Sequence, residues 1–138
     1  GLIGSMACAI KQVKPDATAI GVAPTGADSL TQSLRNGEPV VLDKIATIAD
    51  SLGAPKNLPY SFEIARTYVD RMVHVTDDEM RDGMRRYLSG MQILAEPACA
   101  ASLAAVCGPL RDEMAGQRVA IIACGSNISP ARFEELTG

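Results

Sequence analysis

Cys124 is the thiol with the clearest chemical setting in the sequence. It ends the most hydrophobic stretch, Val119–Cys124, and Asn127 lies in the turn that follows. Ligands of open α/β sheets collect at the carboxyl ends of strands, and a thiol there can donate one weak hydrogen bond. A free cysteine is more often a small buried hydrophobe, so this stretch by itself leaves both interpretations open.

Two carboxylates, Asp50 and Glu96, stand beside apolar residues. A carboxylate in such surroundings is paired, functional or at the rim of the core. Glu96 directly precedes Pro97 at a predicted helix start, where the helix dipole favours an acid. For each carboxylate taken alone, a structural role is the favoured interpretation.

Gly1 and Leu2 open a stretch with helical spacing of apolar residues. A glycine before a helix lets an anion approach the backbone, and the exposed N–H groups and the helix dipole favour phosphate there. Glycine is common in turns before helices, so this feature alone indicates only a helix start. The chain opens without an initiator methionine or a signal-peptide pattern, and we expect either a tag scar or a start within a longer sequence.

Helices and short strands are predicted to alternate along the chain. Apolar spacing predicts helices over 2–13, 27–34, 61–69 and 98–114, with further helices after Thr76 and Pro130. Strands are predicted over 18–23, 71–75 and 119–123, separated from the helices by turns and by an irregular stretch at 38–60. Strands separated by helices imply parallel pairing with helices on both faces. The predicted fold class is therefore α/β, with residues 1–138 as a single segment.

Thr76 and Glu79 have the spacing of a capping box, in which each residue satisfies the backbone N–H of the other. The helix that follows carries apolar residues on one face, namely Met80, Met84, Leu88 and Met91. Such a stripe is far more often core than a cofactor contact. We predict that it is buried.

Composition and charge exclude several classes of function. Apolar residues make up 47% of the chain, and no run approaches the roughly 18 consecutive apolar residues of a membrane span. The net charge is −3 and the basic residues are scattered, which argues against a nucleic-acid partner. The four cysteines form no CxxC pair and His74 is the only histidine, so we predict free thiols, no zinc site and a cytoplasmic location.

The motifs occur together and in a fixed order along the chain. Gly1-Leu2, Thr47-Ile48-Ala49-Asp50, Glu96-Pro97 and the stretch from Cys124 to Ile128 form a set that resembles the threonine dehydratase and serine racemase family. This family belongs to the fold-type II, tryptophan synthase beta-like, pyridoxal-phosphate enzymes. The resemblance runs along essentially the whole chain and implies the C-terminal part of a lyase. Such a lyase converts a β-hydroxy amino acid to a 2-oxo acid and ammonia.

The resemblance also implies roles for single residues. Gly1 would be the last glycine of the loop that holds the cofactor phosphate, and the backbone N–H of Leu2 would join it. Cys124 would face the pyridine nitrogen, and Glu96 would line the cofactor ring. A weak neutral donor at the nitrogen leaves it unprotonated, which β-elimination tolerates.

Asp50 and Asn127 are expected to support this cofactor site without touching the reacting atoms. Asp50 would support the neighbouring loop, and Asn127, in the turn after the strand, is the second supporting residue. Ser51 stands where the family more usually has a glycine, which bears on substrate fit.

The chain departs from the family at two further places. None of its lysines matches the family's cofactor-binding lysine, which lies upstream, so covalent chemistry by this chain alone is not expected. A cation site of some relatives has Ala23 and Ser29 here in place of acids, and only Asp28 remains. Hard cations need several oxygen ligands, so no metal is predicted, and His74 is expected to be structural.

An alternative function remains open from the sequence. A non-catalytic module could act by self-association or by binding a ligand or partner. Exposed sheet edges and apolar surface would favour association, so a homo-oligomer is expected in either case.

Overall fold

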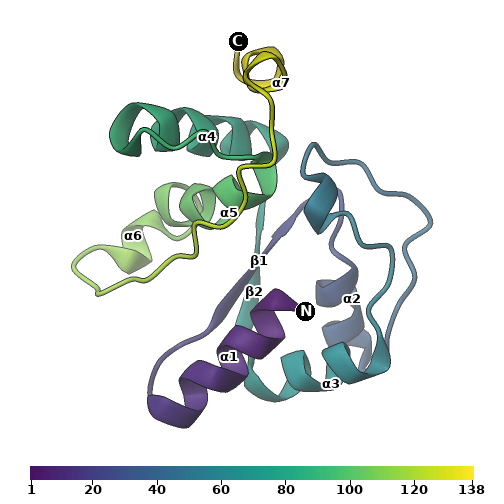
Figure 1. Ribbon diagram of the computed structural model, residues 1–138. Helices are drawn as coiled ribbons and strands as arrows, with labels where there is room; N and C mark the ends of the chain where they lie inside the picture. The colour runs from purple at the N-terminus through teal and green to yellow at the C-terminus, as the bar shows by residue number, and fades with distance from the viewer.

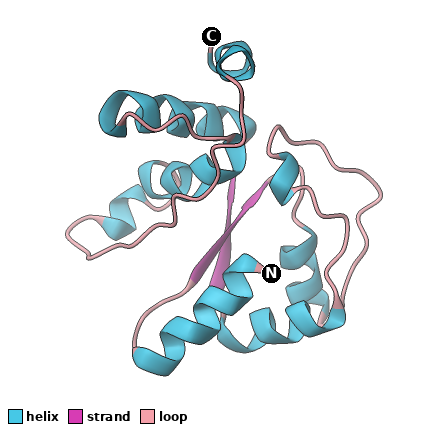
Figure 2. Cartoon of the chain, in the orientation of Figure 1, coloured by secondary structure: helices cyan, strands magenta, loops and turns pink.

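The computed structural model describes residues 1–138, in which helices surround a two-stranded parallel sheet (Figures 1 and 2). The strands are β1 (Ile20–Pro24) and β2 (Arg71–Val75). The helices are α1 (Leu2–Val13), α2 (Ser29–Asn36), α3 (Pro59–Tyr68), α4 (Asp77–Met91), α5 (Pro97–Cys107), α6 (Arg111–Met114) and α7 (Pro130–Thr137), with a 3-10 turn η1 (Asp50–Leu52). No helix of the chain combines the length and the apolar character that crossing a membrane requires.

The two faces of the sheet contact different helices. On one face Val22 and Val75 pack with the core cluster that contains alanines of α5 and Met80 of α4. On the opposite face Gly21 faces Ile3 of α1, and His74 faces α2. Side chains of a strand point alternately to the two sides, so each strand serves both layers. The predicted parallel sheet with helices on both faces is confirmed.

Most element boundaries lie close to those that the sequence predicts. The first helix and the second strand have the predicted bounds, whereas β1 begins at Ile20 and α2 begins at Ser29. The predicted helix 98–114 is divided, because α5 ends at Cys107 before Gly108-Pro109 and α6 follows. Proline lacks the N–H that would continue the helix and restricts the residue before it.

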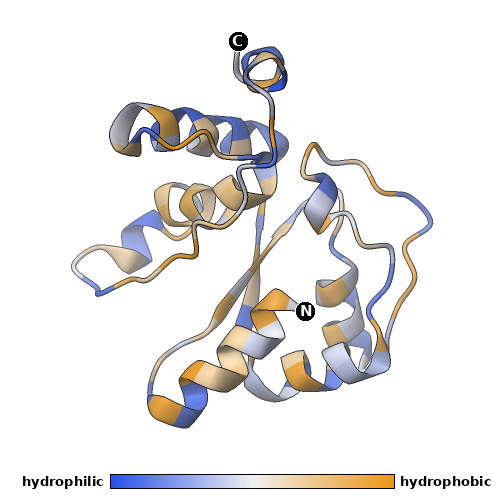
Figure 3. Cartoon of the chain, viewed as in Figure 1, coloured by the Kyte–Doolittle hydropathy of each residue, from blue (hydrophilic) through white to orange (hydrophobic).

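The prediction of a strand at 119–123 is wrong for this chain. These residues run as an extended segment between α6 and α7 and pair with no strand (Figure 1). Val119, Ile121 and Ile122 are 43%, 37% and 40% exposed, and Figure 3 shows the hydrophobic colouring of this stretch. A strand needs a neighbouring backbone for its ladder, and none of the described residues provides one here.

Close packing of α4 on α5 forms the largest helix–helix contact of the core. A Cβ atom on Gly83 would lie 3.0 Å from the carbonyl oxygen of Ala100 and 3.2 Å from its Cβ, so the helices approach closely because Gly83 has no side chain. The capping box of Thr76 and Glu79 is present at the start of α4. The small residues Gly83 and Ala100 thus allow α4 and α5 to approach closely.

The predicted methionine stripe is correct for its first half only. Met80 and Met84 are fully buried, but Leu88 is 40% exposed and Met91 is 62% exposed. Tyr87, at 1% exposure, takes the buried position in the second half. An α-helix has 3.6 residues per turn. Position 87 therefore lies almost directly above Met80 on the buried side of α4, whereas position 88 is rotated away from that side.

Replacing Gly83 by leucine should separate α4 from α5. The added side chain meets the backbone of Ala100, and overpacking of this kind costs about 1–3 kcal/mol. Urea unfolding of Gly83→Leu measures the loss in the free energy of unfolding. The matched control is Gly90→Leu, where a Cβ meets no atom within 4 Å. Equal stability of the two variants would contradict the packing described above.

Asp70 should contribute to stability in a pH-dependent way. A hydrogen bond from Lys11 (2.9 Å) and one from the backbone N–H of Ala19 (2.6 Å) lower the pKa of the Asp70 carboxyl. A lowered pKa stabilises the folded state above the unfolded value of about 3.9, and this contribution is lost as the pH falls through the folded-state pKa. Asp70→Asn should therefore unfold at a lower urea concentration than the wild type at pH 7. The difference should shrink steadily below pH 4, and a constant difference down to pH 2 would exclude the ionised carboxylate as its cause.

Candidate functional site

A small cleft brings together three of the residues that the sequence singles out. Its volume is about 160 Å³, and η1, the start of α5 and the turn before α7 surround it. Asp50, Glu96 and Asn127 all line it, although they lie far apart in the sequence. Apolar residues complete the wall, namely Ile48, Pro97, Ala98, Ile128 and Leu136.

Glu96 joins the start of α5 to the turn that follows Cys124. Its backbone N–H donates to the carbonyl oxygen of Gly125 at 3.1 Å. Gly125 has φ +114°, and a Cβ there would lie 2.6 Å from Oε1 of Glu96. The carboxylate therefore lies directly against a stretch of backbone that only glycine accommodates.

Ser51 makes a contact in the cleft that the sequence did not predict. Its hydroxyl donates to Oε1 of Glu96 at 3.3 Å. The serine at this position thus places a hydroxyl beside the carboxylate. The structure brings Asp50 and Ser51 into one wall with Glu96, which explains why an acid tolerates the apolar surroundings there.

Arg132 is the residue of the cleft that sequence reasoning missed. Its guanidinium pairs with Glu135 at 2.6 Å, and this bond first and the charge of Asp50 further raise the pKa of Arg132. The sequence shows only that an arginine lies in the predicted helix that follows Asn127. Only the position of α7 beside the cleft brings that cation into the same lining as Asp50.

Cys124 ends the extended segment and is exposed. The thiol of Cys99 lies in the neighbouring core at 3% exposure. Burial first, and then the charges of Cys124 and Glu96, raise the pKa of Cys99. The charges of Cys124 and Glu96 therefore act on the buried thiol of Cys99. Of the two thiols, only Cys124 is exposed. All four cysteines are free, as predicted.

Gly1 and Leu2 lie at the uncapped start of α1. Gly1 is the N-cap residue, no side chain caps the helix, and its first turn carries no acid. The carbonyl of Gly1 accepts hydrogen bonds from the backbone N–H and the hydroxyl of Ser5, at 3.2 and 3.1 Å. Because α1 runs antiparallel to β1 (Figure 1), this start lies toward the carboxyl ends of the strands. The backbone N–H groups of the first turn are free to bind an anion.

His74 has a structural partner, as predicted. In the parallel register it stands beside Ala23, and its Nε2 lies 3.0 Å from the hydroxyl of Thr31. Asp28, the remaining carboxylate of that turn, accepts from Gln32 at 2.8 Å and lies 3.9 Å from His74. These contacts hold α2 against the sheet.

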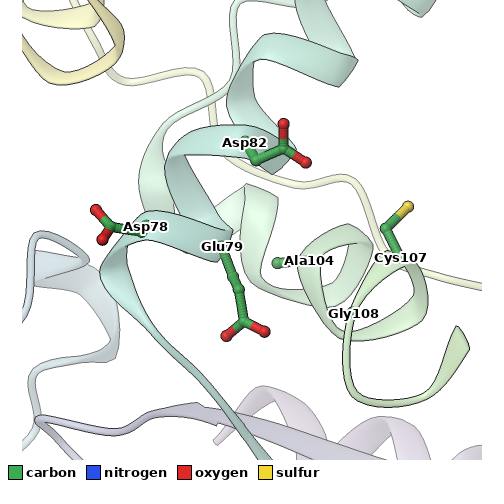
Figure 4. A pocket seen from close by; sticks show the side chains of 6 residues that line it. All are labelled: Asp78, Glu79, Asp82, Ala104, Cys107 and Gly108. Atoms are coloured by element: carbon green, nitrogen blue, oxygen red, sulfur yellow. The ribbon is translucent and has the colours of Figure 1, made fainter.

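A second hollow of about 310 Å³ lies between α4 and the end of α5 (Figure 4). It is lined by Asp78, Glu79, Asp82, Ala104, Cys107 and Gly108. Glu79 already accepts from the N-cap Thr76, and Asp82 pairs with Arg86 at 2.5 Å. The hollow contains none of the predicted site residues, so the cleft at Glu96 remains the candidate site.

A family profile described as "Pyridoxal-phosphate dependent enzyme" matches residues 1–125 of the chain. The chain belongs to this family. The matched range includes the start of α1, the cleft residues Asp50 and Glu96, and the thiol of Cys124. The predicted dependence of the family on pyridoxal phosphate is therefore confirmed.

Curated members of the pyridoxal-phosphate family align with nearly all of the chain. The chain is 42% identical to phenylserine dehydratase of Ralstonia pickettii over 138 residues, which is 100% of the chain and 42% of that protein. It is 35% identical to L-threonine ammonia-lyase of Thermotoga maritima, over 93% of the chain and 31% of that protein. The chain thus spans less than half the length of these relatives.

Solved structures of the same family share the fold. Threonine deaminase isoform 2 of Solanum lycopersicum superposes with a TM-score of 0.90 at 28% identity, over 99% of the chain and 40% of that structure. Maize serine racemase superposes with a TM-score of 0.88 at 27% identity, over 97% of the chain and 42% of that structure. The predicted fold-type II architecture is therefore confirmed.

The contact between Gly125 and Glu96 can be tested by adding one methyl group. Gly125→Ala forces a Cβ onto the carboxylate and strains a φ of +114°, so the free energy of unfolding should fall by roughly 2–4 kcal/mol. Gly116→Ala is the control, because Gly116 also has positive φ (+75°) but open space around it. Its cost should be only about 1–2 kcal/mol in urea unfolding. Equal losses in the two variants would show that the Glu96 contact adds nothing.

Proposed function

We propose that residues 1–138 form the C-terminal part of a pyridoxal-phosphate-dependent ammonia-lyase that acts on a β-hydroxy amino acid. The observation that carries this proposal is the contact of Glu96 with the turn that follows the Cys124 thiol. That contact brings the carboxylates of the cleft beside the only exposed thiol at this end of the fold. The similarity to dehydratases and ammonia-lyases over the full chain supports it.

Several groups of the chain are suited to hold the cofactor. The uncapped start of α1 offers backbone N–H groups at Gly1 and Leu2 for its phosphate. Cys124 offers a weak donor for the ring nitrogen, and Glu96 would lie along the ring. Pyridoxal phosphate, when bound, supplies an electron-withdrawing ring, and the protein's part is to bind and orient it. A donor as weak as a thiol does not hold a proton on the ring nitrogen, which suits an elimination that expels the hydroxyl promptly.

Asp50 and Asn127 would support these contacts from the cleft wall. Asp50 stands one residue before Ser51, whose hydroxyl binds Glu96. Asn127 lies in the turn that Gly125 begins, and both residues line the cleft. Their part is to keep Glu96 and the turn in place while substrate binds.

The covalent link to the cofactor would come from a lysine outside these residues. No lysine lines the cleft, and the relatives are more than twice as long as the chain. Covalent chemistry requires a correctly placed amine. The complete enzyme would therefore combine the contacts described here with a lysine of another segment.

The names of the relatives indicate the class of substrate. They are dehydratases or ammonia-lyases of phenylserine, threonine and 3-hydroxyaspartate, or a serine racemase. Phenylserine, threonine, 3-hydroxyaspartate and serine are all amino acids with a hydroxyl on the β-carbon. The common reaction of the lyases removes that hydroxyl and releases ammonia, and racemisation of a β-hydroxy amino acid is the nearest alternative outcome.

The protein's location and assembly are part of the same proposal. Four free cysteines are typical of a reducing compartment, which supports a cytoplasmic location. Exposed apolar residues of α1 and of the extended segment would be covered in an assembly, among them Leu2, Val13 and Ile122. The same surface supports the second candidate, a non-catalytic module that associates with itself or with another chain.

Spectral titration with pyridoxal phosphate separates the two candidates. The complete enzyme should bind the cofactor and release ammonia from β-hydroxy amino acids.

The Cys124 variants test the role of the thiol. Cys124→Ala should lower kcat by roughly tenfold, which corresponds to one hydrogen bond of about 1.4 kcal/mol, and Cys124→Ser should restore most of the lost kcat. Cys107→Ala, in the other hollow, is the matched control and should behave as wild type. Absence of cofactor binding in the complete protein would reject the enzyme and leave the association module.

A further inference from the structure

Asp77 is an acid in the first turn of α4 to which the proposed function gives no role. The other two acids of this turn have partners nearby in the sequence. Asp78 pairs with Arg81 at 2.6 Å, and Glu79 accepts from the backbone N–H of Thr76 at 2.7 Å. Asp77 is half-buried, and its carboxylate instead accepts two hydrogen bonds from a distant part of the chain.

The two bonds to Asp77 hold the segment that leads into η1. The hydroxyl of Thr47 donates to Oδ1 of Asp77 at 2.8 Å, and the backbone N–H of Ile48 donates to Oδ2 at 3.2 Å. The same hydroxyl accepts from the backbone N–H of Ala49 at 3.2 Å, because a hydroxyl is both donor and acceptor. Since each carboxylate oxygen binds a different group, the segment is held at two points.

This segment continues directly into one wall of the cleft. Ile48 itself lines the cleft, and the fully buried Ala49 is the N-cap residue of η1. Asp50 and Ser51 follow in η1 and line the same cleft. The hydroxyl of Ser51 donates to Oε1 of Glu96 at 3.3 Å. A short path of hydrogen bonds and backbone therefore connects the start of α4 with the carboxylate at the start of α5.

The helix dipole alone does not account for the contacts of Asp77. An acid in the first turn of a helix is stabilised by the exposed N–H groups whether or not it has a further partner. Asp78 and Glu79 already place negative charge at this helix start. The contacts of Asp77 with Thr47 and Ile48 are additional to that effect, and they act on the cleft wall and not on α4 itself.

We propose that Asp77 is a positioning residue for the cleft, a role that rests on the proposed function. Its carboxylate holds Thr47 and Ile48 and thereby sets the place of Ser51 beside Glu96. Asp77 does not line the cleft. It therefore acts on the site only through the segment that it holds.

Hydrogen exchange measures this hold without the cofactor. In the complete enzyme after removal of the cofactor, deuterium uptake of the peptide 46–53 is followed by mass spectrometry. Asp77→Asn replaces one accepting oxygen by an amide that cannot accept, so exchange in this peptide should accelerate roughly threefold to tenfold, the effect of one lost hydrogen bond. Thr47→Val should accelerate it at least as much, whereas Thr47→Ser, which keeps the hydroxyl, should stay within twofold of wild type.

Asp78→Asn is the matched control. It removes the same charge from the same helix turn, but the Asp78 side chain is 92% exposed and contacts only Arg81 among charged groups. Deuterium uptake of the peptide 46–53 should be unchanged in this variant. Any fraying of α4 caused by the loss of charge should appear equally in both variants, in the peptide 79–86.

Titration with pyridoxal phosphate tests whether the hold matters for the site. The apparent Kd for the cofactor should rise roughly threefold to tenfold in Asp77→Asn and should not change in Asp78→Asn. In a Ser51→Ala background, Asp77→Asn should change the Kd by less than twofold, because its effect passes through the contact of Ser51 with Glu96. Independent effects on general stability would instead multiply.

Two results would overturn the proposal. Uptake of the peptide 46–53 within twofold of wild type in Asp77→Asn would show that the carboxylate does not hold the wall. Full multiplication of the Asp77→Asn and Ser51→Ala effects on the Kd would show that Asp77 does not act through Ser51. Hydrogen exchange does not depend on cofactor binding, so a wild type that fails to bind pyridoxal phosphate rejects the proposed function separately.

Discussion

The contact between the start of α5 and the turn after Cys124 is the interaction on which the site depends. Glu96 holds Gly125 by a backbone hydrogen bond, and its carboxylate fills the space that a glycine leaves open. Ser51 binds the same carboxylate from η1. One acidic side chain thus connects three segments that the chain brings together from distant parts of the sequence.

The position of Glu96 is set in turn by the packing of α5. Small residues along this helix let it lie against the sheet on one side and against α4 on the other, with Gly83 meeting Ala100 at close range. Close-packed interiors transmit small displacements, because few voids exist to absorb them. A displacement of α5 in the core should therefore also displace Glu96, which is the N-cap residue of that helix.

The groups around Cys124 differ in kind from those at the start of α1. At α1 the free backbone N–H groups and the helix dipole provide a fixed positive end for an anion. At Cys124 a single thiol stands at the end of a segment that has few bonds of its own.

Much of the fold could be predicted from the sequence alone. The first helix, the second strand, the capping box at Thr76 and the parallel pairing of strands all depend on residues within a few positions of each other or on the order of the elements. The ordered motifs at Gly1, Asp50, Glu96 and Cys124 likewise indicated the family, because residue types and their order along the chain are properties of the sequence itself.

Other features were decided only by the tertiary structure. The apolar stretch at 119–123 has the composition of a strand, but a strand forms only where another backbone lies beside it. Tyr87, and not Leu88, is buried because the face of α4 is defined by its contact with α5. The bond from Ser51 to Glu96 and the place of Arg132 over the cleft join residues distant in the chain. Local sequence sets the elements because their hydrogen bonds are local, whereas these contacts depend on how the elements pack.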